Sequence, residues 1–256
     1  MTDVPSRPVV LAHGLAGFSR IGVRRIRLAT YFNRIPQHLS DLGCRVIAAE
    51  VPALGTIEAR AKALARIVRN ASPDEPVHVI AHSMGGLDAR HMITHLGMHE
   101  RVTTLVTLGT PHRGSPVADR VSEYARSSRL RDLLHLSKLR NTALHDLRTA
   151  VCARWNERTP DAPGVRYYSI AGVKPRDQMI YGLKFTHDVV APVEGPNDGL
   201  VSESSAAWGE TWPHWDCDHV NLVGWTGPRT RALGYARDVR PRFTQIVAHL
   251  AEAERR

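Results

Sequence analysis

Apolar residues gather in short runs along the chain, and between these runs they recur every three or four positions. The runs predict buried strands, whereas the spaced pattern predicts amphipathic helices. Strands are expected at residues 7–14, where the strand runs into a loop, and at 44–51, 77–81, 102–108 and 165–171. Helices are expected at residues 31–43, from Thr56 onward, at 84–97 and at 241–253. This alternation is typical of an α/β fold, with a mostly parallel sheet that helices cover on both faces.

The alternation of strands and helices stops at Gly109. From about residue 115 to 158 the chain is rich in leucine and arginine, and the pattern predicts several helices with breaks between them. A helical insertion between two strands would lie above the sheet as a cap, unless it packs against the core. No linker separates two folding units, so we expect one domain over residues 1–256 that carries this insertion.

The composition is that of a globular protein, because 43% of the 256 residues are hydrophobic and 23% are charged. No run of about 18 apolar residues is present, so we expect no transmembrane segment. The first residues lack the basic and apolar regions of a secretory signal. We therefore expect a cytoplasmic protein, or a secreted mature form from which a leader was removed.

The formal net charge of +9 would favour anionic surfaces, acidic ligands or nucleic acid. The basic residues are scattered, however, without a dense block or interleaved aromatic residues. We therefore expect a solvated basic surface and no nucleic-acid partner. The three cysteines, at positions 44, 152 and 217, lack metal-ligand spacing. They predict unpaired thiols, or one disulfide bridge if the protein is exported.

Ser83 lies in the segment Val79-Ile80-Ala81-His82-Ser83-Met84-Gly85-Gly86, between a predicted strand and a predicted helix. This is the context of a nucleophile elbow, a sharp turn that tolerates only small residues two positions before and after the serine. Ala81 and Gly85 meet that demand. The turn would place the serine hydroxyl at a helix N-terminus, where backbone N–H groups favour negative charge. We expect the N–H of Met84 to be one donor to an oxyanion.

A serine nucleophile needs a base and an acid that orients the base, and in this motif the acid and then the histidine follow the serine. His219 is the expected base, because the apolar segment after it could hold it over the sheet, and His214 is the alternative. Asp198 is the expected acid, because a following glycine permits a tight turn beside its carboxylate. Asp188 and Asp177 fit the acid position less well.

A tetrahedral intermediate needs two N–H donors for its oxyanion. The loop after the first strand reads His13-Gly14-Leu15-Ala16-Gly17, and its two glycines let the backbone curl toward the nucleophile. We therefore expect the N–H of Leu15 to be the second donor, beside the N–H of Met84.

Five segments occur in a fixed order: Ala12–Gly17, Ile80–Arg90, Leu108–Ser115, Asn197–Val201 and Asp218–Asn221. Together they resemble the bacterial true lipases, the triacylglycerol lipase family of the α/β-hydrolase fold, over nearly the whole chain. The resemblance implies carboxylic ester hydrolysis and a sheet that lacks the first two strands of the full fold. It also implies a mobile helical lid from about residues 115–158.

Many members of that family bind a structural calcium ion through an aspartate two residues after the catalytic histidine. Here that position is Asn221, and the upstream candidate Asp177 matches only loosely. The sequence therefore predicts no metal ion and no other cofactor.

We expect a serine hydrolase of the lipase or carboxylesterase type that forms an acyl-enzyme on Ser83 and acts on lipid-like acyl esters. The leucine-rich insertion favours acyl chains of medium or greater length and transient contact with a lipid interface. The alternatives are a polyester depolymerase, short-chain esterase, thioesterase or acyltransferase on the same triad and, more remotely, an inactive binding protein on this fold. Because a histidine base must be neutral, activity should fall as the pH drops through about 6 to 7.

Overall fold

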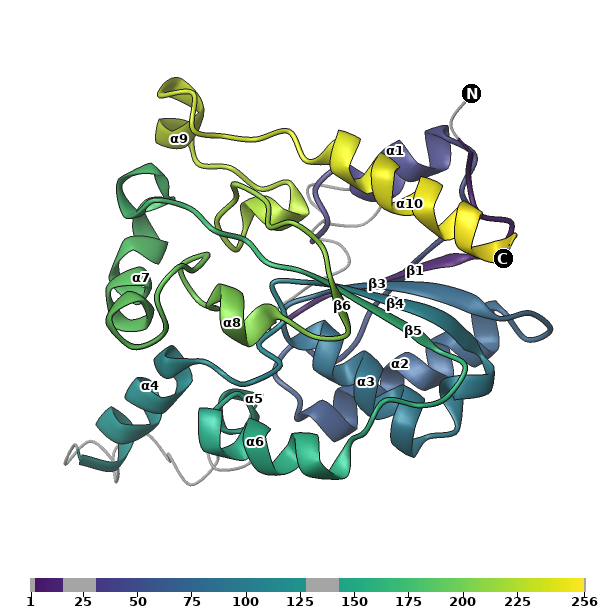
Figure 1. Cartoon of the computed structure of the whole chain (residues 1–256), viewed down its shortest axis with the longest axis horizontal. Coiled ribbons are helices and arrows are strands. Elements are labelled where there is room, and N and C mark those ends of the chain that lie inside the picture. The colour runs from purple at the N-terminus through teal and green to yellow at the C-terminus, as the bar shows by residue number, and fades with distance from the viewer. Residues whose placement is uncertain (1–2, 16–30, 128–142, 256) are drawn as a thin grey trace, which may run out of the picture.

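The computed structural model describes residues 3–15, 31–127 and 143–255. The described residues form a six-stranded sheet in the order β2-β1-β3-β4-β5-β6, and every neighbouring pair is parallel (Figure 1). The strands are β1 (Val9–Ala12), β2 (Val46–Ala49), β3 (Val77–His82), β4 (Val102–Leu108), β5 (Arg166–Ile170) and β6 (Glu210–Thr211). The predicted parallel sheet is confirmed, and β4 has the predicted bounds.

The order of the strands reverses between β1 and β3. β1 pairs with β2 on one side and with β3 on the other, so that Leu11 lies beside both Ala48 and Ile80. In an open parallel sheet, ligands bind at the carboxyl ends of the strands at such a reversal. The loop after β1 and the turn after β3 therefore meet where a site is expected.

Helices cover both faces of the sheet (Figure 1). α1 and α10 pack on one face, against side chains such as Leu11 and Ile80, and α2 and α3 pack on the other, against Val10 and Val79. Successive strand residues point to opposite faces, so one continuous apolar run contributes to both cores. The four helices are α1 (Ile35–Asp41), α2 (Ile57–Ala71), α3 (Met84–His95) and α10 (Arg240–Glu254).

Local sequence determines where two of these helices begin. Thr56 caps α2 as predicted, because its hydroxyl oxygen accepts a hydrogen bond from the N–H of Ala59 (3.3 Å). α1 begins at Ile35, later than predicted. The preceding Arg34 has left-handed backbone angles (φ 59°, ψ 0°), and Pro36 then favours the first turn of the helix.

The segment after β4 is helical, as predicted, in the parts that the structure describes. It contains α4 (Pro116–Ser127), α5 (Ala143–Asp146) and α6 (Thr149–Arg158). These helices gather at the end of the sheet where the strands have their carboxyl ends (Figure 1). Residues 128–142, which include much of the leucine-rich part of the predicted lid, lie outside the described residues. The lid over 115–158 therefore stays a prediction, as does the single domain over 1–256.

One long helix was not predicted from the sequence. α7 (Tyr181–Glu194) lies between β5 and the turn that holds Asp198. The remaining elements are short: α8 (Glu203–Ala206), α9 (Pro228–Ala232) and the 3-10 helices η1 (Met98–Glu100), η4 (Arg176–Gln178) and η5 (Asn221–Val223). No helix in the described residues is long and apolar enough to cross a membrane.

The three cysteines are buried and have free thiols, as predicted. Burial raises the pKa of both Cys152 and Cys217 to about 12. These two thiols are therefore protonated and unreactive at neutral pH.

The two ends of the described chain lie close together (Figure 1), and Glu254 joins them. Its carboxylate accepts hydrogen bonds from the N–H (2.8 Å) and the hydroxyl (2.7 Å) of Ser6 and from the N–H of Arg7 (3.0 Å). His78 Nε2, on β3, lies 2.9 Å from the same carboxylate. Burial opposes ionisation of Glu254, but these hydrogen bonds lower its pKa to about 2.

Candidate active site

Ser83 lies at the turn from β3 to α3, with φ 55° and ψ −134°. Among the described residues, only Ser83 and Arg34 are non-glycine residues with a positive φ. Such angles cost about 1–3 kcal/mol and persist only where surrounding contacts hold them. Here the Ser83 N–H donates to the Leu108 carbonyl (2.9 Å), and the Ser83 carbonyl accepts from the Thr110 hydroxyl (2.8 Å). Contacts with the end of β4 thus hold the strained turn.

Two glycines allow this turn to approach the loop after β1. A Cβ at Gly85 would stand 2.6 Å from the carbonyl oxygen of Ala12, and a Cβ at Gly14 would stand 2.7 Å from Ser83 Cβ. Real Cβ atoms essentially never come within 3.0 Å of such neighbours. Both positions therefore require glycine, and the loop after β1 packs directly against the serine.

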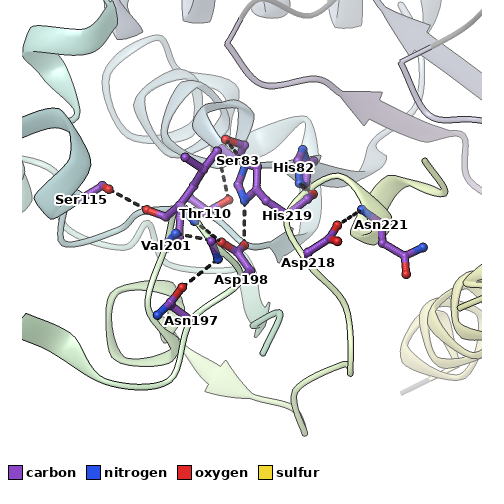
Figure 2. A network of polar contacts seen from close by, with 12 residues as sticks. His82, Ser83, Thr110, Ser115, Asn197, Asp198, Val201, Asp218, His219 and Asn221 are labelled. Atoms are coloured by element: carbon purple, nitrogen blue, oxygen red, sulfur yellow. Dashed lines mark hydrogen bonds and ion pairs between the residues drawn. The ribbon is translucent and has the colours of Figure 1, made fainter. Parts of the chain in front are cut away.

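Ser83, His219 and Asp198 form a hydrogen-bonded chain (Figure 2). His219 Nε2 lies 3.0 Å from Ser83 Oγ, and His219 Nδ1 lies 2.7 Å from Asp198 Oδ2. The side chains of His219 and Asp198 are 6% and 0% exposed. Because an ionised carboxylate only accepts, Nδ1 carries the proton and Nε2 is left to accept the proton of the serine hydroxyl. This arrangement can activate a serine as a nucleophile.

Backbone groups fix the Asp198 carboxylate. Its Oδ1 accepts hydrogen bonds from the N–H groups of Leu200 (2.9 Å) and Val201 (2.8 Å), which leaves Oδ2 for the imidazole. The Asp198 carbonyl also accepts from the His219 N–H (2.8 Å). The acid and the base are thus joined through both main chain and side chain. The turn follows α7 instead of following a strand directly, which the sequence pattern did not predict.

Arg60 of α2 fixes the loop after β1 and has no exposed surface. Its guanidinium donates to the carbonyls of His13 (2.6 Å), Gly14 (3.2 Å) and Pro52 (2.7 Å). Its Nε donates to Asp88 Oδ2 on α3 (2.8 Å). One buried side chain therefore connects α2, α3 and the loop.

Arg60 also sets the direction of the peptide between Gly14 and Leu15. The Gly14 carbonyl accepts from Arg60 and from His13 Nδ1 (2.9 Å). In a trans peptide the N–H points opposite to the carbonyl, and the described residues include no cis peptide. The Leu15 N–H is therefore directed away from Arg60. The other expected donor, Met84, is the first residue of α3, where N–H groups have no partner within the helix.

The electrostatics of Asp88 depend on Arg60. Asp88 is buried, and its Oδ1 has no hydrogen-bond partner among the described residues. Burial raises the pKa of Asp88 to about 7, although the Arg60 guanidinium opposes that rise. Loss of Asp88 would leave the Arg60 charge uncompensated next to the loop after β1, and loss of Arg60 would raise the pKa of Asp88 further.

A cavity of about 530 Å³ lies against Ser83 and His219. Its walls come from the loop after β1, from α4 and α5, and from the segments around Asp198 and His219. The apolar lining residues are Leu15, Pro111, Val117, Ala118, Leu144, Leu147, Leu200, Val201, Val220, Val223 and Trp225. Such walls fit an apolar acyl chain next to the nucleophile.

The alternative residues from the sequence lie elsewhere. His214 contacts Glu203 (2.7 Å), and 49% of its side chain is exposed. Asp188 forms a surface ion pair with Arg176 (2.6 Å). The Asp177 carbonyl accepts a hydrogen bond from the side chain of Lys184. None of these contacts involves the serine.

The residues at the calcium position of the resembled family do not fit a calcium ion. The Asn221 side chain donates to the Arg237 carbonyl (2.9 Å) and accepts from the Arg237 N–H (3.1 Å). The Asp218 carboxylate accepts from the N–H groups of Ile180 (3.1 Å) and Asn221 (3.0 Å). The buried ammonium of Lys174 acts electrostatically on Asp218. The oxygens thus have partners, and the described residues include no cluster of three His, Cys, Asp or Glu that could hold a metal.

Sequence reasoning missed Arg60 and Asp88. A signal for Arg60 was present, because it interrupts the apolar stripe that Ile57, Ala61 and Leu64 form on α2. A charged residue in such a stripe requires a buried partner. The partner itself, on another helix, could not be identified from one sequence.

A protein-family model described as PGAP1-like alpha/beta domain matches residues 53–207. The chain is 27% identical to triacylglycerol lipase 2 of Saccharomyces cerevisiae, over 96% of this chain and 92% of that protein. It is also 27% identical to the triacylglycerol lipase of Vibrio cholerae, over 79% of this chain and 74% of that protein.

Solved structures with a similar fold include lipases. The mature form of Bacillus licheniformis lipase BlEst2 superposes with a TM-score of 0.73, at 22% identity over 96% of this chain and 93% of that chain. The Staphylococcus hyicus lipase superposes with a TM-score of 0.71, at 19% identity over 99% of both chains. At these identities the similarity establishes the α/β-hydrolase fold.

Proposed function

This chain belongs to the family of the PGAP1-like alpha/beta domain and is a carboxylic ester hydrolase of the lipase type, and we propose that it cleaves lipid acyl esters through an acyl-enzyme on Ser83. One observation carries the proposal. A buried chain of hydrogen bonds runs from Asp198 through His219 to the serine hydroxyl, and this hydroxyl faces an apolar cavity.

In the first half-reaction, Ser83 Oγ attacks the carbonyl carbon of the ester while its proton passes to His219 Nε2. The carbonyl oxygen becomes an oxyanion, to which the N–H groups of Leu15 and Met84 donate. Asp198 stabilises the imidazolium through Nδ1. When the bond to the alcohol breaks, the imidazolium returns the proton to the leaving oxygen, and the acyl group stays on the serine.

In the second half-reaction, a water molecule attacks the acyl-enzyme. His219 Nε2 takes a proton from the water, and the same two N–H groups stabilise the second oxyanion. The imidazolium then protonates Ser83 Oγ as the bond to the acyl group breaks. The carboxylic acid leaves, and the enzyme returns to its starting state.

The apolar walls of the cavity support acyl chains of medium or greater length, because each buried CH₂ contributes about 0.8 kcal/mol. Exposed aromatic side chains near this end of the molecule support transient contact with a lipid surface. They are Tyr124 on α4 and the edge-to-face pair Tyr181 and Phe185 on α7. A lipid ester could then pass from the surface into the cavity.

The proposal is tested by hydrolysis of p-nitrophenyl esters from acetyl to palmitoyl, with Ser83→Ala as the control. We expect kcat/KM to increase with chain length and activity to be lost in Ser83→Ala. A preference for acetyl or butyryl esters would indicate that the substrate is a short-chain ester or a polyester and not a lipid ester. Equal rates with and without the serine hydroxyl would overturn the mechanism and favour a binding protein.

We also propose that the hydrolysis needs no metal ion. The contacts of Asn221 and Asp218 and the nearby Lys174 ammonium support this view. Dialysis against a chelator, followed by return of calcium, should leave both kcat and the melting temperature unchanged. A loss that calcium restores would contradict it.

A further inference from the structure

His82 is a buried histidine that the proposed chemistry does not use. It directly precedes the nucleophile, and only 1% of its surface is exposed. His82 Nε2 lies 2.9 Å from the carbonyl oxygen of His219, and His82 Nδ1 lies 2.7 Å from the hydroxyl of Tyr31. The two histidines are neighbours in Figure 2, with ring centroids 4.6 Å apart.

The chemistry of these groups fixes the direction of both hydrogen bonds. A carbonyl oxygen only accepts, so His82 Nε2 carries the proton and donates to His219. His82 Nδ1 is then an acceptor, and the Tyr31 hydroxyl donates to it.

Tyr31 extends this chain to the loop after β1. Its hydroxyl lies against Gly14, 2.8 Å from the position that a Cβ of this residue would take. The Gly14 carbonyl is itself held by His13 and Arg60. A chain of contacts therefore runs from Gly14 through Tyr31 and His82 to the main chain of His219.

We propose that Tyr31 and His82 are positioning residues that hold the main chain of His219 in a fixed relation to the loop after β1. The inference rests on the proposed function, because it assigns these residues to the same reaction. The His219 N–H donates to Asp198 and its carbonyl accepts from His82, so both backbone groups of the base are held. Neither side chain transfers a proton to the substrate.

The charge state of His82 supports this role. Burial, and then the neighbouring His219, lower the pKa of His82 well below its ordinary value. His82 therefore stays neutral while the base becomes an imidazolium during turnover. A neutral neighbour adds no like-charge repulsion at that step, and its Nδ1 remains an acceptor for Tyr31.

Two substitutions of His82 separate the hydrogen bonds. Glutamine places its amide nitrogen near the position of Nε2 and can still donate to the His219 carbonyl, whereas asparagine reaches only the region of Nδ1. Because small misplacements of catalytic groups cost up to about 100-fold in rate, we expect His82→Asn to lower kcat about 10- to 100-fold. KM should change little, because the effect lies in the transition state. His82→Gln should recover most of the lost kcat, and Tyr31→Phe should lower kcat about 10-fold.

The matched control is His78→Asn on the same strand. His78 is equally buried and hydrogen-bonded, but it contacts Glu254 and Thr103, far from the serine. We expect this variant to lose thermal stability while kcat stays unchanged below its melting temperature.

Steady-state kinetics of all variants on one p-nitrophenyl ester decides the matter. A His82→Asn enzyme with the kcat of the wild type would overturn the positioning role, as would equal losses in His82→Asn and His82→Gln. A loss of kcat in His78→Asn would also overturn it. If the wild-type protein itself hydrolyses no ester, the proposed function fails instead.

Discussion

Ser83 combines two conflicting demands at one residue. The reaction needs its hydroxyl, whereas its backbone angles (φ 55°, ψ −134°) are those that glycine adopts most easily. Hydrogen bonds from the turn to Leu108 and Thr110 hold the conformation. The strain therefore serves to present the hydroxyl, and the rest of the fold maintains it.

This strain predicts an unusual order of stability. We expect Ser83→Gly to have a larger free energy of unfolding than Ser83→Ala, by about 1–2 kcal/mol, because glycine relieves the positive φ. Urea denaturation followed by circular dichroism measures both values. At Ser122 on α4 the same two substitutions should give the usual order, with alanine more stable. A Ser83→Gly protein that is no more stable than Ser83→Ala would contradict the account.

At the scale of elements, α2 and α3 act together on the loop after β1. The loop would be free to rotate its peptides if its carbonyls faced solvent. Arg60 of α2 instead holds two of them, and Asp88 of α3 holds Arg60. The direction of the Leu15 N–H is thus determined by the packing of two helices.

Arg60→Lys tests this arrangement. A lysine ammonium is a point charge and cannot reach the carbonyls of His13, Gly14 and Pro52 and the Asp88 carboxylate at once. Loss of one oxyanion donor lowers the rate about 100- to 1000-fold. A loosened loop should lose part of this stabilisation, so we expect kcat to fall about 10- to 100-fold. KM should change little. Arg66→Lys, on the exposed side of α2, is the control and should behave as the wild type. A raised KM with an unchanged kcat would speak against an oxyanion role.

The elements that the sequence predicts well are those whose burial dictates their pattern. The apolar run of β4 is buried nearly throughout, and its bounds match the structure. α7 was missed because its hydrophobic residues do not mark a buried face. Tyr181, Phe185 and Val193 are exposed, and Pro192 lies inside the helix. Composition and period alone could not separate it from a loop.

At the scale of the whole molecule, residues distant in the chain meet in contacts that one sequence does not reveal. The order of the motifs pointed to Ser83, Asp198 and His219, and the fold brings these three side chains together. The pairing of His82 with Tyr31 depends on tertiary packing, which local patterns do not encode. Glu254 is a similar case, because it joins the last helix to both the N-terminal segment and β3.

Glu254 gives a prediction about stability and pH. Its pKa in the folded protein is lowered to about 2, below the ordinary value of 4.5. The ionised group therefore stabilises the fold above pH 4.5, and this contribution is lost as the pH falls toward 2. We expect Glu254→Gln to lower the free energy of unfolding by about 1–3 kcal/mol at pH 7, with a smaller difference near pH 3.

Urea denaturation at the two pH values checks this expectation. Glu157→Gln, at an exposed position on α6, is the control and should change stability little at either pH. A difference between wild type and Glu254→Gln that grows as the pH falls would reverse the predicted sign and refute the argument.

Ser83 should react as a nucleophile that His219 and Asp198 activate. The most direct test is covalent labelling with a fluorophosphonate, followed by mass spectrometry of the peptides. We expect a single modified peptide with the phosphonate on Ser83, and labelling at least about 100-fold slower in His219→Ala. Modification at another residue, or an unchanged rate in His219→Ala, would contradict the claim.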